Sequence, residues 1–102
     1  MDLGFDLSKI EGFEWDKGNL EHIKKHNVEH RECEEIFVNM PLRVKQNKKH
    51  SREEKRFEAL GQTNDGRLLF IVFTIRINKF RIISARDQNR KERGYKNVGV
   101  EV

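Results

Sequence analysis

Apolar residues follow helical spacing in the first part of this 102-residue chain. Leu20 and Ile23 lie three residues apart and follow Asp16, a residue type favoured at helix N-caps. We therefore expect a short helix that begins after Asp16 and that Asn27 ends. Residues 13–15, just before it, form a candidate edge strand.

A second helix is predicted to begin at Val28, with Glu29 at its N-cap. Pro41 is expected to stop it, because proline cannot continue a helix. Its buried face is predicted from four apolar residues at positions i, i+3, i+4 and i+7, namely Cys33, Ile36, Phe37 and Met40.

From residue 42 onward the pattern changes to that of β-strands. Tight turns are expected at Asn64-Asp65-Gly66 and at Asn78-Lys79. The almost continuous apolar run at 68–77 predicts a central strand covered on both faces. The candidate strands are residues 42–44, 56–61, 68–77 and 80–85.

A final helix is expected after the last strand, capped by Asp87 and ended by Gly94. The predicted order is two N-terminal helices, an antiparallel sheet of about four strands and a C-terminal helix. Helices followed by strands indicate an α+β fold, with the helices packed against one face of the sheet.

The length corresponds to one domain, which we place at residues 13–102 after a lead-in of residues 1–12. Neither a signal peptide nor a membrane-spanning stretch is evident, so a cytoplasmic protein without a membrane partner is expected. The single Cys33 cannot form an internal disulfide and is predicted to be a buried small hydrophobic residue.

Charge is unevenly distributed along the chain. Residues 1–42 carry a net charge of −5, and residues 43–102 carry +9. A basic half of this kind favours a polyanionic partner such as nucleic acid. The alternative is an ordinary solvated surface.

The segment FRIISARDQNRKERGY, residues 80–95, concentrates the arginines. Regular alternation in its strand places Arg81 on the face of Ile83 and Ala85, opposite Ile82. Positions i, i+4 and i+7 of a continuous helix would be taken by Arg86, Arg90 and Arg93. Guanidinium groups bind phosphate bidentately, which suits RNA binding or stabilisation of a phosphorane. The alternative is a solvated helix face, with Glu92 and Asp87 as ion-pair partners of the arginines.

His50 lies in a basic loop, just before Glu54 and Arg56. A histidine beside carboxylates and arginines suits RNA cleavage without a metal, in which a base activates the 2′-hydroxyl group. The alternative is a loop histidine without a role. Tyr95 is a candidate proton donor or stacking platform near the arginines.

His22 and His26 have a spacing that can chelate a metal, but no third ligand completes a set. We interpret them as packing or capping residues and predict no metal and no cofactor. Trp15 is expected to anchor the first helix to the sheet.

Several sequence segments, in the same order along the chain, resemble the BrnT toxin family, also called DUF497. The strand-to-helix segment at 81–93 is the most specific of them. In the first part of the chain they are FEWD at 13–16, EHIKKHNV at 21–28 and EEIF before Pro41. The next is the stretch from His50-Ser51 through Glu54 and Arg56 to ALG at 59–61. The last are GRLLFIVFT at 66–74 and RIISARDQNRKER at 81–93.

The resemblance implies a RelE-like α+β fold and the toxin half of a bacterial type II toxin–antitoxin pair. It implies a ribonuclease that inhibits translation and is neutralised by a BrnA-like antitoxin, a small ribbon-helix-helix DNA-binding protein. The complex of the two represses its own operon, so operator DNA would be bound only through the antitoxin.

The resemblance also implies where the site lies. As catalytic residues of a metal-independent endoribonuclease we expect His50, Glu54, Arg56, Arg86 and Arg90. As RNA-binding residues we expect Arg81, Arg93 and Tyr95, although Gly94 displaces Tyr95 from the family's pattern. The alternative is a non-catalytic nucleic-acid-binding or operon-regulatory protein that acts in complex with its antitoxin.

Overall fold

A computed structural model describes residues 6–50 and 54–97 of the chain, and for Leu7, His50 and residues 95–97 it describes the backbone alone. The predicted α+β class is confirmed: three α-helices accompany a five-stranded sheet.

The sheet has the strand order β1-β5-β4-β3-β2. The four longer strands are antiparallel neighbours, and β1 adds to the edge of β5 in parallel, so the sheet is mixed. The predicted edge strand at 13–15 is thereby confirmed. The strand bounds are β1 Phe13–Glu14, β2 Arg43–Gln46, β3 Phe57–Gln62, β4 Leu68–Arg76 and β5 Lys79–Asp87.

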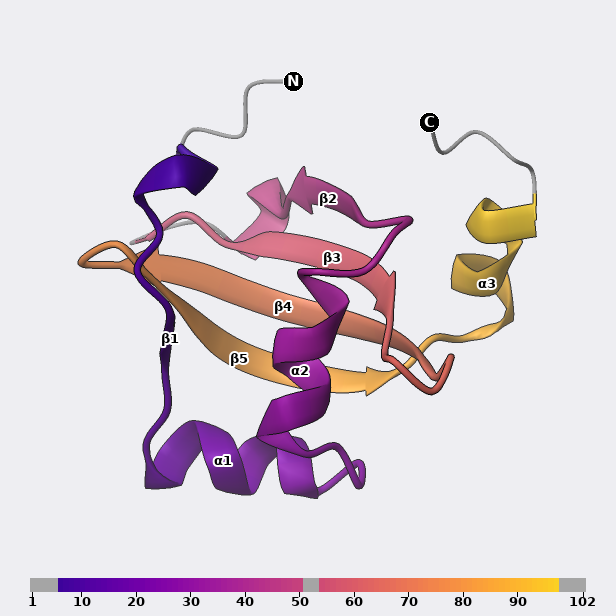
Figure 1. Cartoon of the computed structure of the whole chain (residues 1–102), viewed down its shortest axis with the longest axis horizontal. Coiled ribbons are helices and arrows are strands. Elements are labelled where there is room, and N and C mark those ends of the chain that lie inside the picture. The colour runs from indigo at the N-terminus through magenta and orange to yellow at the C-terminus, as the bar shows by residue number, and fades with distance from the viewer. Residues whose placement is uncertain (1–5, 51–53, 98–102) are drawn as a thin grey trace.

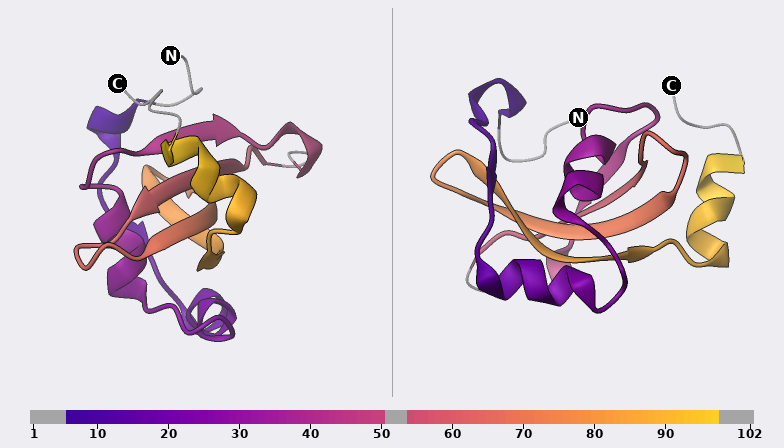
Figure 2. Two further views of the ribbon diagram at one scale, coloured as in Figure 1. Left: turned by 90° about the vertical axis from the view of Figure 1, so that its right-hand side faces the viewer. Right: turned by 60° about the horizontal axis from the view of Figure 1, so that its bottom comes forward.

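The helices lie in two places around the sheet. α1 (Lys17–Lys24) packs along β5, and α2 (His30–Ile36) crosses the face formed by β3 and β4 (Figure 1). α3 (Arg90–Asn97) lies beyond the end of β5, away from α1 and α2 (Figure 2). Two short 3-10 helices, η1 (Leu7–Lys9) and η2 (Lys48–His50), complete the described elements.

The core fills the space between the helices and one face of the sheet. Its aromatic centre is Phe37, whose ring stacks on Phe80 with centroids 4.5 Å apart and meets Phe73 edge-on at 5.2 Å. Burying these rings together removes a large apolar area from water. The fully buried apolar residues are Ile23, Val28, Cys33, Ile36, Phe57, Ala59, Leu69, Ile71, Phe73, Phe80, Ile82 and Ala85.

Both predicted N-caps of the first two helices are confirmed. The Asp16 carboxylate accepts the backbone N–H of Asn19, whose side chain in turn accepts the N–H of Asp16. At α2 the Glu32 carboxylate accepts the N–H of Glu29, and the Glu32 N–H donates to the backbone carbonyl of Glu29. These hydrogen bonds satisfy backbone donors that the first turn of a helix leaves free.

The predicted end of α2 is wrong. The helix ends at Ile36 with Phe37 as its C-cap, so Met40 is 71% exposed and does not belong to the buried face. Long-range hydrogen bonds hold the chain after the helix against β3: Asn39 donates to the carbonyl of Gln62, and the Gln62 amide donates to the carbonyl of Met40. The chain thus leaves the helix at Phe37, four residues before Pro41, and is held against β3 by these hydrogen bonds.

The predicted cap and end of the last helix are also wrong. Asn89 caps α3 through a reciprocal pair with Glu92, and Gly94 lies inside the helix. Asp87 is still part of β5 and binds Arg67 instead. The side chain of Asn89 is therefore the one that meets the free N–H groups of the first turn.

The first hairpin turn is confirmed, with Gly66 at φ 86°. The second lies one residue earlier than predicted, at Ile77 and Asn78, which have φ values of 49° and 60°. Two positive φ values in succession give the twist that a two-residue hairpin needs.

A β-bulge changes the face on which the β5 side chains lie. Phe73 pairs with Ile82 and Val72 with Ser84, so Ile83 has no opposite partner. Ala85 therefore joins Ile82 in the core, whereas Arg81 and Arg86 both lie on the other face. The predicted regular alternation, with Arg81 beside Ala85, is wrong for this reason.

The central strand is not covered equally on its two faces. Leu69, Ile71 and Phe73 are fully buried beneath the helices, but Phe70 and Val72 on the other side are half-buried. The expected double covering of 68–77 is therefore incorrect. The uncovered side faces away from the hydrophobic core.

Candidate functional site

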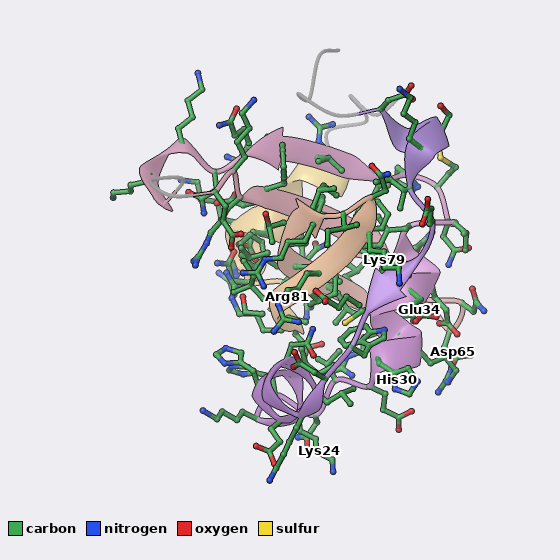
Figure 3. All side chains as sticks on the ribbon, turned by 90° about the vertical axis from the view of Figure 1, so that its left-hand side faces the viewer. Lys24, His30, Glu34, Asp65, Lys79 and Arg81 are labelled. Carbon is green, nitrogen blue, oxygen red and sulfur yellow. The ribbon has the colours of Figure 1, made fainter. Side chains whose placement is uncertain are left out.

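The sheet face opposite the core, called here the open face, carries two residues of the predicted site, Arg81 and Arg86. Strand register aligns its residues in rows across the sheet. One row is Arg43, Leu60, Phe70 and Arg86, the next is Lys45, Glu58, Val72 and Ser84, and a third pairs Thr74 with Arg81. Viewed from the β4–β5 hairpin, Arg81 lies away from His30 and Glu34 of α2 (Figure 3).

At the hairpin end of this face, Glu54 binds Arg76. The Nε and Nη2 groups of Arg76 each donate to one carboxylate oxygen of Glu54, both at 3.1 Å. These hydrogen bonds hold the pKa of Glu54 below its ordinary value, and the charges of Arg56 and Arg81 act in the same direction. Glu54 is therefore an ionised carboxylate with both oxygens engaged.

Arg81 is held by two acidic residues beside the same end. Its Nη1 lies 2.8 Å from the carboxylate of Asp16 and 3.4 Å from that of Glu14. The hydrogen bond from Arg81 is the main reason that the pKa of Asp16 is lowered. Since Asp16 also caps α1, Arg81 connects β5 to the start of that helix.

At the other end of the open face, Arg86 is fixed on three sides. Its Nη1 and Nη2 donate to the two oxygens of Glu92 at 2.8 and 2.9 Å, and Nη1 also donates to the carbonyl of Asp87. Its guanidinium carbon lies 4.2 Å from the centroid of the Phe70 ring, a cation–π distance. A guanidinium fixed in this way loses little freedom when it binds an anion.

One edge of the Arg86 guanidinium stays available. An arginine can bind an anion in two-pronged fashion through Nη1 with Nη2, or through Nε with Nη2. Glu92 takes the first edge of Arg86, and within the described residues the Nε–H and the second Nη2 hydrogen have no hydrogen-bond partner. This second edge has the geometry that a phosphate requires.

Two hydrogen-bond partners lower the pKa of Glu92. Burial raises the pKa of Glu92, but hydrogen bonds from Arg86 and from the backbone of Asn89 outweigh it and leave the pKa below its ordinary value. Glu92 is therefore charged at neutral pH, as the ion pair with Arg86 requires.

The other two arginines of this segment lie on α3. Arg90 is the first residue of the helix and is exposed, and Arg93 donates from Nε to the carbonyl of Gln88 at 3.1 Å. Because Arg86 belongs to β5, the three arginines do not share one helix face as predicted. They are gathered instead around the junction between β5 and α3.

The structure separates the predicted residues into two groups. Glu54, Arg56 and Arg81 interact at the hairpin end, and Arg86 meets α3 at the other. Four residues of β4 separate the rows of Thr74 and Phe70, which is roughly 13 Å along a strand. The predicted site residues therefore form two separate groups and not one cluster.

Two predicted site residues, His50 and Tyr95, have side chains that lie outside the described part of the structure. Their backbones belong to η2 and α3. Of the suggested alternative partners, Glu92 does pair with Arg86, whereas Asp87 pairs with Arg67.

Sequence reasoning did not identify Arg76, Phe70 or Glu58 as part of this face, although it offered Glu92 as an ion-pair partner of the arginines. Glu54, the partner of Arg76, lies 22 residues earlier in the sequence, so no local pattern indicates the pair. Alternation in β3 does place Glu58 on the side of Leu60, opposite Phe57 and Ala59, so this signal was present.

The remaining chemically capable residues do not form a site. Burial raises the pKa of the Cys33 thiol to about 12, which confirms the prediction of a buried, unreactive cysteine. His22 and His26 are exposed, so they are not packing residues, and a capping role stays a prediction. Trp15 donates from Nε1 to Glu34 of α2 at 2.9 Å, and thus contacts the second helix as well as preceding the first.

Comparison with known proteins shows the family of the chain. Within the described residues, none of the helices has the length and apolar composition needed to cross a membrane. No curated protein matches the chain. The family described as "Ribonuclease toxin, BrnT, of type II toxin-antitoxin system" matches residues 15–92, a range that holds α1, α2, β2 to β5 and both groups of the open face. With most of its length matched, the chain belongs to the BrnT family of type II toxin–antitoxin ribonuclease toxins.

Proposed function

We propose that this protein is a metal-independent endoribonuclease that cleaves RNA on the open face and thereby inhibits translation. The observation that carries the proposal is the position of Arg86. Glu92 and Phe70 hold its guanidinium group and leave one edge free for bidentate binding of an anion. A fixed guanidinium stabilises the negative charge that develops on a phosphate under attack, without reorganisation at the moment of reaction.

The proposed reaction uses the RNA's own 2′-hydroxyl group as the nucleophile. Its oxygen attacks the adjacent phosphorus, the bond to the 5′-oxygen breaks, and a 2′,3′-cyclic phosphate results. A proton acceptor must take the 2′-hydroxyl proton, and the family resemblance points to His50 or Glu54. Arginine can supply the charge stabilisation that a metal ion provides in other nucleases.

The remaining basic residues would bind the RNA on either side of the cleaved bond. Arg90, Arg93 and Tyr95 belong to α3, next to Arg86, and Arg56 and Arg81 belong to the hairpin end of the open face. Contacts of this kind depend on phosphate charge and position the strand without reading its sequence.

The family implies an antitoxin partner, which we propose to be a BrnA-like ribbon-helix-helix protein. Such a partner would neutralise the toxin in the cytoplasm and bring it to operator DNA, which the toxin itself would not contact. A carboxylate-rich segment of the antitoxin laid over the open face would compete with RNA for the same arginines.

A second candidate function is nucleic-acid binding without cleavage. The observation in its favour is that both oxygens of Glu54 are bound by Arg76, so this carboxylate is not free to accept a proton. In that case the toxin would act only within the regulatory complex.

One matched pair of variants tests the proposal. Arg86→Ala removes the fixed guanidinium, and Arg31→Ala removes an exposed arginine that pairs with Glu35 on α2, with the same change in net charge. Purified wild type and Arg31→Ala should cleave a single-stranded RNA and arrest growth on expression, and Arg86→Ala should do neither. A salt-sensitive gel shift by the wild type, with intact RNA recovered from the complex, would favour the second candidate.

A further inference from the structure

Among the described residues, four glutamates reach the open face or the arginines on it: Glu14 lies 3.4 Å from Arg81 at the edge, and of Glu54, Glu58 and Glu92 two are fully engaged. Both oxygens of Glu54 accept hydrogen bonds from Arg76, and both oxygens of Glu92 accept from Arg86. A carboxylate held in this way must first break an ion pair before it can take up a proton. Neither is therefore well placed to act as a base.

Glu58 differs from both. Its nearest ionic partner in the described structure is Lys45, whose Nζ lies 3.8 Å from Oε1, beyond hydrogen-bond distance. Within the described residues neither oxygen of Glu58 accepts a hydrogen bond. The side chain is 23% exposed, so it is reachable by a ligand yet partly withdrawn from water.

The sheet register places Glu58 at the middle of the open face. It lies between Lys45 of β2 and Val72 of β4, in the row next to the one that holds Phe70 and Arg86. The hydrogen bonds to Glu92 raise the pKa of Arg86, and the charge of Glu58 raises it further. Glu58 is thus an uncommitted carboxylate close to the proposed phosphate position.

We propose that Glu58 is the proton acceptor of the cleavage reaction, in place of Glu54. This assignment rests on the proposed ribonuclease function. A Glu58 oxygen takes the proton of the 2′-hydroxyl group as the 2′-oxygen bonds to phosphorus. The bond between phosphorus and the 5′-oxygen breaks, and the 5′-oxygen takes a proton from water. The resulting hydroxide is neutralised by the proton on Glu58, which restores the carboxylate.

The apolar neighbours of Glu58 support this role. Val72 and Leu60 adjoin it on the same face, so apolar side chains lie on two sides of the carboxylate, between it and the row of Arg86. In such surroundings charges interact more strongly than they do in bulk water. Arg86 would hold the phosphate while Glu58 meets the sugar beside it.

The test compares three glutamate-to-glutamine variants that change net charge equally. They are Glu58→Gln, Glu54→Gln, and Glu35→Gln on α2, which in the described part of the chain pairs with Arg31 and the backbone of Asn64, away from the open face. The probe is a fluorescent single-stranded RNA of mixed sequence for cleavage, and its all-2′-deoxy counterpart for affinity. Loss of a general base typically lowers the rate by about 100- to 10,000-fold.

We expect Glu58→Gln to lower kcat by at least about 100-fold while its affinity for the deoxy strand stays equal or rises, because one negative charge is removed. Glu54→Gln should lose less, and Glu35→Gln should match the wild type. Glu58→Asp, which keeps the acid, should recover part of the activity. The slope of log kcat against pH on the acid side should flatten in Glu58→Gln.

The outcomes separate this assignment from the proposed function. If Arg86→Ala abolishes cleavage but Glu58→Gln cleaves at the wild-type rate, the Glu58 assignment is wrong and the ribonuclease function stands. A larger loss in Glu54→Gln than in Glu58→Gln also overturns it. If folded wild-type protein cleaves no RNA, the function itself fails. Circular dichroism of each variant verifies folding.

Discussion

Glu92 holds Arg86 with both carboxylate oxygens, at 2.8 and 2.9 Å, and one of these oxygens also caps the helix that carries it. The same side chain therefore fixes α3 and aims the proposed phosphate-binding residue. Glutamine at this position would keep an oxygen for the cap but lose the charge and one hydrogen bond to Arg86.

We predict that Glu92→Gln lowers kcat/KM for RNA cleavage by about 10- to 100-fold, because Arg86 loses its fixed orientation. A double-mutant cycle tests the cause. In the Arg86→Ala background Glu92→Gln should have no further effect on RNA affinity, since Glu92 acts through Arg86. Independent, additive losses of affinity would show that Glu92 contributes by another route.

A second prediction concerns Arg67, which joins three parts of the fold. Its guanidinium binds Asp87 of β5 at 2.7 Å, Glu32 of α2 at 3.0 Å, and the backbone carbonyls of His26 and Asn27. Arg67→Ala leaves these acceptors without their donor.

We expect Arg67→Ala to lower the free energy of unfolding by about 2–3 kcal/mol, measured by urea denaturation. The exposed Arg31→Ala serves as the control and should cost less than about 1 kcal/mol. Equal losses in the two variants would mean that the Arg67 network adds nothing beyond a surface ion pair.

Acid should weaken the same network. The hydrogen bond from Arg67 lowers the pKa of Asp87 in the folded state. A group with a depressed folded pKa contributes stability above its unfolded pKa, about 3.9 for aspartate, and loses that contribution as pH falls through the folded pKa. Urea midpoints should therefore drop below about pH 4, and this drop should be smaller in Arg67→Ala.

Gly61 marks a close approach between β3 and α2. A Cβ at this position would lie 2.9 Å from the Cβ of Ile36 and 3.3 Å from Cδ1 of Leu42. We predict that Gly61→Ala lowers the free energy of unfolding by about 1–3 kcal/mol. Gly94→Ala is the matched control: its Cβ would meet nothing within 4 Å, and alanine in a helix is favoured by about 1 kcal/mol. A stabilising effect of both variants would contradict the predicted crowding.

Cys33 provides a direct probe of global unfolding. Burial raises its thiol pKa to about 12, so the reactive thiolate is scarce at pH 8 and is covered by the core. Thiol reagents should modify the native protein only at the rate at which it unfolds, and the denatured protein at once. Rapid labelling of the native protein would show that α2 leaves the sheet easily.

Local sequence signals predicted much of the fold. Asp16 and Glu29 were identified as N-caps, and Asn64-Asp65-Gly66 as a turn, because each depends on residues close by in the sequence. The end of α2 depends instead on hydrogen bonds to β3, more than 20 residues away. The residues around Pro41 therefore could not predict where α2 ends.

The candidate site was predicted in residue type more than in arrangement. Arg86 was singled out from its residue type, but its position over Phe70 and on the same face as Arg81 depends on the register of β4 with β5. The pairing of Glu54 with Arg76 likewise joins separate segments. Whether Arg86 and the other arginines act on RNA stays a prediction for the variants above.

The unpaired residue in β5 sets a limit on how this sequence can vary. Arg81 and Arg86 are five positions apart, an odd spacing that a regular strand would direct to opposite sides, and Ile83 brings them to the same side. Many substitutions at Ile83 would preserve that arrangement. A strand that kept Ile83 but paired it regularly would instead turn Arg86 toward the interior and Ala85 toward solvent, so the bulge, rather than the identity of residue 83, decides where Arg86 points.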